Sequence, residues 1–99
     1  MTFRLHPKAE EELEAESNYY SEIDQETVGN FLRAYDLALN YITESPKNCR
    51  KRGDHRRFNL SSFPFYLPDI VRNETTIIIL AVAPNSRKPG YWKDRRLDS

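Results

Sequence analysis

The stretch "TTIIILAVA", residues 75–83, is the most hydrophobic part of the chain and constrains the fold more than any other feature. Its apolar part, from Ile77 to Ala83, is far too short to span a bilayer, which takes about 20 residues. A short run rich in β-branched residues is typical of a strand that is buried on both faces. We therefore expect this segment to be a central strand of a covered sheet.

Two helical patterns precede it. "HPKAEEELEAESNYY" has Pro7 where a helix begins, and Asp24 can cap a second helix by accepting a hydrogen bond from its free amides. Pro46 ends the second pattern. With so short a connection, the helices should form an antiparallel hairpin. The apolar positions of the second helix are Val28, Phe31, Leu32, Tyr35, Leu39 and Ile42.

The remaining patterns indicate strands and loops. "TFRL" (2–5), "RRFNL" (56–60) and "FYLPDIVR" (65–72) are typical of strands, and "SPKNCRKRGDH" (45–55) of a loop. The expected order is β-α-α-β-β-β. This order predicts an α+β fold in which an N-terminal strand and an α-helical hairpin pack on a small antiparallel β-sheet.

Length and composition limit the class of protein. A chain of 99 residues is expected to form a single domain, 1–99, with a small core. Cys49 is the only cysteine, so no internal disulfide can form, and the N-terminus lacks an apolar signal stretch. We expect a soluble cytoplasmic protein.

The formal net charge of zero hides a strong asymmetry. Residues 1–45 hold ten acids and three bases, whereas residues 46–99 hold five acids and twelve bases. Such a division suggests one surface that faces anions and another that does not, although solvated helix faces followed by a basic tail would give the same counts.

Three segments carry a resemblance to a known family. "FRLHPKAEEELEAESNYY" (3–20), "LSSFPFYL" (60–67) and "ILAVAPNSRKPGYWKDR" (79–95) together resemble the RelE/ParE superfamily, the toxins of bacterial type II toxin–antitoxin modules. The resemblance implies the β-α-α-β-β-β fold, a cognate antitoxin as partner and a toxin–antitoxin hetero-oligomer. "RKPGYWKDR" resembles ParE-like members, which implies DNA gyrase as target and growth inhibition or plasmid stabilisation as role.

Two alternatives stay open. One is a RelE-like endoribonuclease that cuts mRNA on the ribosome without a metal. The other is a non-toxic relative that only binds the antitoxin. No cofactor is expected in any of these cases.

The candidate site residues differ between these functions. In a nuclease, arginines would stabilise the charged phosphorane and Tyr91 would orient or protonate, while Tyr91 or Trp92 could stack on a base. The catalytic candidates are Arg56, Arg57, Arg87 and Tyr91. The candidates for binding the target or the antitoxin are Arg87, Lys88, Trp92, Lys93, Arg95 and Arg96, and these groups should converge on one basic surface.

Several residues depart from the family pattern or lack a clear role. Pro84 stands where many relatives carry a histidine, and Asp69 stands where many carry a tyrosine and would add negative charge near the expected anion surface. His6 is expected to be a capping or surface residue, and His55 is either the remaining candidate for a general base or an exposed loop histidine. One cysteine and two distant histidines give no metal-ligand spacing.

Overall fold

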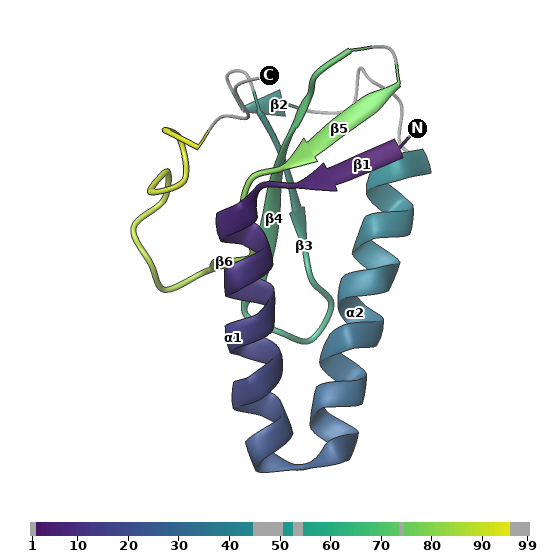
Figure 1. Cartoon of the computed structure of the whole chain (residues 1–99), viewed down its shortest axis with the longest axis vertical. Coiled ribbons are helices and arrows are strands. Elements are labelled where there is room, and N and C mark those ends of the chain that lie inside the picture. Colours follow the sequence, from purple (N-terminus) through teal and green to yellow (C-terminus); the bar gives the residue numbers. More distant parts are fainter. Residues whose placement is uncertain (1, 45–50, 53–54, 74, 96–99) are drawn as a thin grey trace.

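The structure is a computed structural model that describes residues 2–44, 51–52, 55–73 and 75–95. Two helices form a hairpin beside a mixed β-sheet (Figure 1). Cys49 and Arg96 lie outside the described residues. The elements in chain order are β1 (Thr2–Leu5), α1 (Pro7–Ile23), α2 (Gln25–Glu44), β2 (Lys51–Arg52), β3 (His55–Asn59), β4 (Phe65–Val71), β5 (Thr76–Ile79) and β6 (Ala83–Pro84).

Both helices begin where the sequence predicts. The His6 imidazole Nδ1 accepts a hydrogen bond from the Lys8 amide at 3.1 Å, and Pro7 occupies the first turn of α1. The Asp24 carboxylate accepts from the Thr27 amide at 2.6 Å, so Asp24 alone separates the two helices and caps α2. The expected helical hairpin is confirmed, and its closed end extends beyond the sheet (Figure 1).

The sheet has the strand order β1-β5-β4-β3-β2, and β6 pairs with β4. The hydrophobic run is central as predicted, because β5 lies between β1 and β4. The predicted α+β fold is confirmed, but the sheet is mixed where an antiparallel sheet was expected, since β1 pairs with β5 in parallel. A parallel neighbour needs a long crossover, and the chain between β1 and β5 supplies one by including the whole helical hairpin.

A β-bulge divides the hydrophobic run. Asp69 of β4 faces Ile79, whereas Tyr66 of β4 faces Ala83. The run therefore advances four residues while β4 advances three, which is the one-residue excess of a bulge. The extra residue separates β5 from β6 and turns the backbone of residues 80–82 toward α1.

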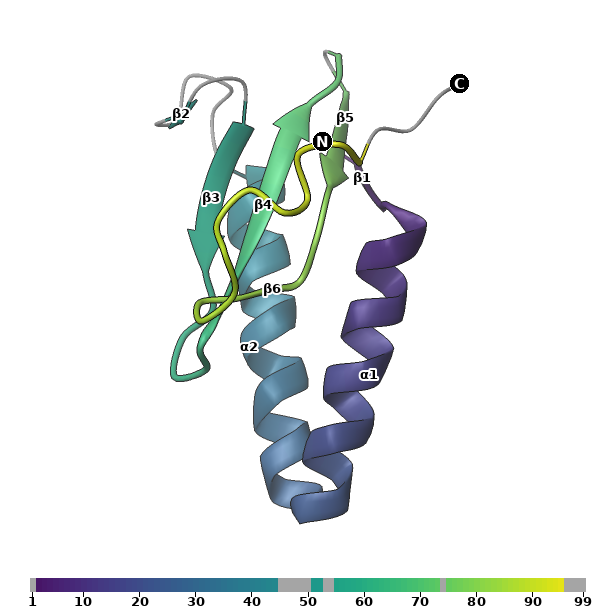
Figure 2. The same cartoon turned by 90° about the vertical axis from the view of Figure 1, so that its left-hand side faces the viewer.

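Side chains pack on both faces of the sheet. The larger core lies between the sheet and the helices and includes Phe31 and Ile42 of α2 with Leu67, Ile77 and Ile79 of the strands. A smaller cluster on the other face consists of Tyr66, Ile78, Leu80, Ala81, Ala83 and Trp92. Figure 2 shows why this face is covered: the segment 85–95 crosses it on the side away from the helices. Within the described residues no helix is long and apolar enough to cross a membrane.

Candidate functional site

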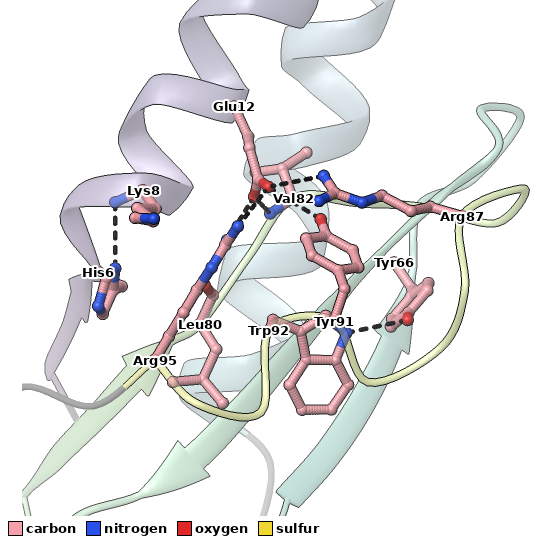
Figure 3. A network of polar contacts seen from close by, with 10 residues as sticks. All are labelled: His6, Lys8, Glu12, Tyr66, Leu80, Val82, Arg87, Tyr91, Trp92 and Arg95. Carbon is pink, nitrogen blue, oxygen red and sulfur yellow. Dashed lines mark hydrogen bonds and ion pairs between the residues drawn. The ribbon is translucent and has the colours of Figure 1, made fainter.

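A carboxylate from α1 ties the C-terminal segment to the body of the molecule. Glu12 Oε1 accepts hydrogen bonds from the Val82 amide at 3.0 Å and from Arg95 at 2.9 Å (Figure 3). Glu12 Oε2 accepts from the Tyr91 hydroxyl and from the second Arg95 nitrogen, both at 2.9 Å. Arg87 approaches the same oxygen at 4.0 Å. We call this set (Glu12, Val82, Arg87, Tyr91 and Arg95) the Glu12 cluster.

The position of Arg95 follows from the bulge and from Pro68. In a hydrogen-bonded antiparallel pair, each residue donates to and accepts from the other. Leu80 donates its amide to the Pro68 carbonyl at 2.8 Å, but Pro68 has no N–H with which to return the bond. Arg95 donates to the Leu80 carbonyl instead, at 3.2 Å. The proline thus leaves an acceptor that an arginine side chain satisfies.

Tyr91 is held firmly in its protonated form. Burial raises the pKa of its hydroxyl far above the ordinary value, and the hydrogen bond to Glu12 adds to that effect. The guanidinium of Arg87 stacks on the Tyr91 ring, 3.6 Å from the ring centroid. The guanidinium of Arg95 lies 5.0 Å from the same centroid. Tyr91 can therefore donate a proton in a hydrogen bond, but near neutral pH it cannot accept one as a base.

Trp92 lies in the second core rather than at the surface. Its side chain is 3% exposed, and its indole Nε1–H donates to the Tyr66 hydroxyl at 3.0 Å. The His55 ring meets the indole edge-on with centroids 4.5 Å apart. These contacts attach the C-terminal segment to β3 and β4. Trp92 is thus unavailable for stacking on a base while this packing holds.

The expectation that Arg56 joins a basic surface is wrong. Arg56 is 1% exposed and forms a two-point ion pair with Asp69, from Nε to Oδ1 at 2.9 Å and from Nη2 to Oδ2 at 3.0 Å. The two residues face each other across β3 and β4, on the side of the sheet that the helices cover. Asp69 likewise adds no charge to an anion surface, because it is fully buried and paired.

The other predicted cations lie at the surface. Alternation along β3 turns Arg57 to the opposite face, where it lies exposed over the Tyr66 ring at 3.8 Å. Arg87, Lys88 and Lys93 are exposed on the C-terminal segment. Gly90, with φ of 86°, makes the turn between Lys88 and Lys93. The structure therefore divides the described cations into three groups. Arg56 is buried, Arg95 is bound to Glu12, and the exposed group consists of Arg57, Arg87, Lys88 and Lys93.

Pro84 and His55 do not assemble a proton-transfer site among the described residues. Pro84 belongs to β6 and pairs with Phe65, and its place after the bulge is structural. His55 packs against Trp92. No group of His, Cys, Asp and Glu in the described part of the chain could hold a metal ion.

Glu12 is the residue that sequence analysis missed. Its partners stand 70 to 83 positions away along the chain, so local patterns give no hint of them. One signal was available: Glu12 follows Ala9 by three residues and therefore lies beside the buried face of the helix, where a carboxylate needs partners.

An apolar groove lies on a different part of the surface, between α2 and the edge of β3. It has a volume of about 440 Å³, and Leu37, Tyr41 and Phe58 form much of its wall. Leu37 and Tyr41 are 65% and 63% exposed, which is high for residues of their size. β2 pairs with the first two residues of β3, and no other described strand pairs with the rest of that edge beside the groove.

Comparison with known proteins shows a likeness to solved structures. A solved chain from the chromosomal ParDE TA system of P. aeruginosa superposes with a TM-score of 0.61 and 19% sequence identity, covering 85% of this chain and 95% of that one. No protein-family model matches the sequence, and no curated protein does. The likeness shows that this chain has the fold of the ParDE chain, as the family resemblance implied.

Proposed function

We propose that this protein is the toxin of a bacterial type II toxin–antitoxin module, that it inhibits growth by binding DNA gyrase, and that a cognate antitoxin neutralises it. The observation that carries the proposal is the fold shared with the ParDE chain over nearly the whole length of both. The segment "RKPGYWKDR" supports the ParE-like choice of target.

The arrangement of the predicted catalytic residues favours a binding protein over a nuclease. A metal-independent nuclease needs a proton acceptor and an open group of cations around the phosphate. Here Arg56 is buried against Asp69, and the Tyr91 hydroxyl is a donor with a strongly raised pKa. Binding requires only a stable surface, and the exposed cations Arg87, Lys88 and Lys93 provide one beside a rigid support.

The antitoxin is proposed to occupy the groove between α2 and β3. An extended or helical segment could bury Leu37 and Tyr41 and add backbone hydrogen bonds along the part of the β3 edge with which no described strand pairs. The complex would be the hetero-oligomer that the family resemblance implies.

The experiment that tests the target follows methionine and thymidine incorporation together in the first minutes after expression without antitoxin. We expect DNA synthesis to stop first while translation continues. If protein synthesis collapses first, the gyrase proposal fails and ribosome-dependent cleavage of mRNA takes its place. If neither falls although the protein is folded, the chain is a relative that has lost toxicity.

A further inference from the structure

Four hydrogen bonds fill the acceptor sites of the Glu12 carboxylate, and Arg87 is a second guanidinium beside it that these sites leave without a close bond. Two guanidinium groups, a phenol and a backbone amide converge on the two oxygens of Glu12. Arg87 stays at 4.0 Å, too far for a good hydrogen bond, and is 55% exposed. The donor set would therefore accommodate an anion with more oxygens and a higher charge.

Open space adjoins these donors. A cleft of about 380 Å³ lies at the cluster and is lined by His6, Lys8, Arg87, Tyr91, Asp94 and Arg95. Its wall carries three cations against the single carboxylate of Asp94. Burial, Arg95 and Lys8 lower the pKa of His6, so His6 adds no charge at neutral pH. An anion can thus approach the cluster from solvent through a basic cleft.

We propose that the Glu12 cluster is a binding site for a phosphate-type oxyanion, and that the Glu12 carboxylate is its displaceable occupant. A phosphate group offers two oxygens to the Arg95 fork and further oxygens to Tyr91, to the Val82 amide and to Arg87. The Val82 amide would not lose its partner when Glu12 leaves, because the anion replaces it. This site is independent of the gyrase proposal, since it needs no macromolecular target.

Substitution of Glu12 by glutamine tests the proposal on the purified full chain. Glu12→Gln keeps a carbonyl oxygen for Val82 but removes the competing charge. We expect it to bind inorganic phosphate about tenfold or more tighter than the wild type, since each charged hydrogen bond that the anion recovers contributes on that scale. The binding constant comes from titration followed by NMR, with the Val82 amide and the Arg95 Nε–H as the signals that should move.

Two further variants make the result specific. Adding Arg87→Gln to Glu12→Gln should reverse most of the gain, because Arg87 is the guanidinium free to close on the ligand. Glu14→Gln removes the same charge from an exposed position of the same helix and should leave phosphate binding at the wild-type level. Equal gains for the Glu12 and Glu14 variants, or no gain for the folded Glu12 variant, would overturn the proposal.

A short single-stranded RNA, titrated in parallel, identifies the form of the oxyanion. If RNA shifts the same two signals, the site accepts phosphodiesters. If only inorganic phosphate does, it accepts a free or terminal phosphate. Both results support the site, whereas RNA that shifts only the exposed Lys88 and Lys93 while phosphate shifts nothing contradicts it.

Discussion

At the scale of single residues, the buried pair of Arg56 and Asp69 has a free-energy cost as well as a favourable interaction. Both charges lose their hydration, and burial pushes the pKa of Asp69 up against the lowering effect of Arg56. The attraction between the two groups offsets that cost only while both are present. Replacing one of the two residues therefore removes the ion pair while the other charged group stays in an apolar surrounding.

A double-mutant cycle tests this dependence. We expect Arg56→Met or Asp69→Leu alone to lower the free energy of unfolding by about 3–5 kcal/mol, because each removes both bonds of the two-point ion pair while the other charged group stays buried. The double variant should recover most of that loss, because its two apolar side chains can pack together. Urea unfolding measures all four proteins, and additive losses in the double variant would contradict the pairing.

His6 links the start of α1 to pH. Its Nδ1 must stay unprotonated to accept from Lys8, and burial together with Arg95 and Lys8 lowers its pKa below the ordinary 6.5. His6 therefore becomes protonated at a higher pH in the unfolded chain than in the folded one. The stability that the His6 cap contributes is complete above pH 6.5 and is lost as the pH falls from 6.5 to the lowered pKa.

His6→Asn separates this titration from the others in the protein. Asparagine caps helices well but does not titrate. The difference in the free energy of unfolding between the wild type and His6→Asn should therefore fall as the pH is lowered from 8 to 5. Thermal unfolding across that range measures it, and a difference that stays constant with pH would refute the role of His6.

The helix-capping residues were predictable from the sequence, and the buried ion pair was not. His6 and Asp24 act on amides two and three positions away, so a local pattern identifies them. Arg56 and Asp69 stand 13 positions apart, and the sequence does not say that both point toward the helices. A charged residue in a strand is read as solvent-facing unless its partner across the sheet is known, and that depends on register.

At the scale of elements, the C-terminal segment owes its course to Gly90. Its φ of 86° lies in the left-handed region, and an added Cβ would stand 3.0 Å from the Lys93 side chain. Gly29, inside α2, has ordinary helical geometry, and its nearest side-chain atom, on Arg33, would be 3.6 Å from a new Cβ. The two glycines therefore form a matched pair for one substitution.

Alanine should act in opposite directions at these two positions. Gly90→Ala is expected to destabilise the fold by about 1–2 kcal/mol through backbone strain. Gly29→Ala is expected to stabilise it by about 0.5–1 kcal/mol through helix propensity. Chemical denaturation of both variants gives the signs, and a stabilising Gly90→Ala would show that the turn is not the one described.

The bulge between β5 and β6 marks the limit of prediction at this scale. Hydrophobicity identified residues 75–83 as interior but could not show where the strand is interrupted. Pro68 is the local sign of a defect in the ladder, because proline has no N–H to donate. Its partner across the sheet, Leu80, and the rescue of that carbonyl by Arg95 depend on tertiary contacts.

At the scale of the whole molecule, the two proposed functional surfaces lie on different elements. The C-terminal segment crosses the face of the sheet away from the helices (Figure 2). The apolar groove lies between α2 and the edge of β3. The charge asymmetry of the sequence foreshadowed two unlike surfaces but not their positions, because Glu12 brings an acidic helix into contact with the basic segment.

The groove can be tested without disturbing the rest of the protein. Leu37 and Ile23 are both on helices and are 65% and 55% exposed, but only Leu37 lines the groove. Leu37→Lys should weaken binding of the antitoxin encoded by the neighbouring gene by about 30-fold or more, the loss expected when a central apolar contact of about 2 kcal/mol is removed.

Ile23→Lys is the control and should bind the antitoxin like the wild type. Both variants should fold normally, because surface substitutions away from caps and cores cost little. If Ile23→Lys loses binding and Leu37→Lys does not, the antitoxin covers the end of the helical hairpin and not the groove.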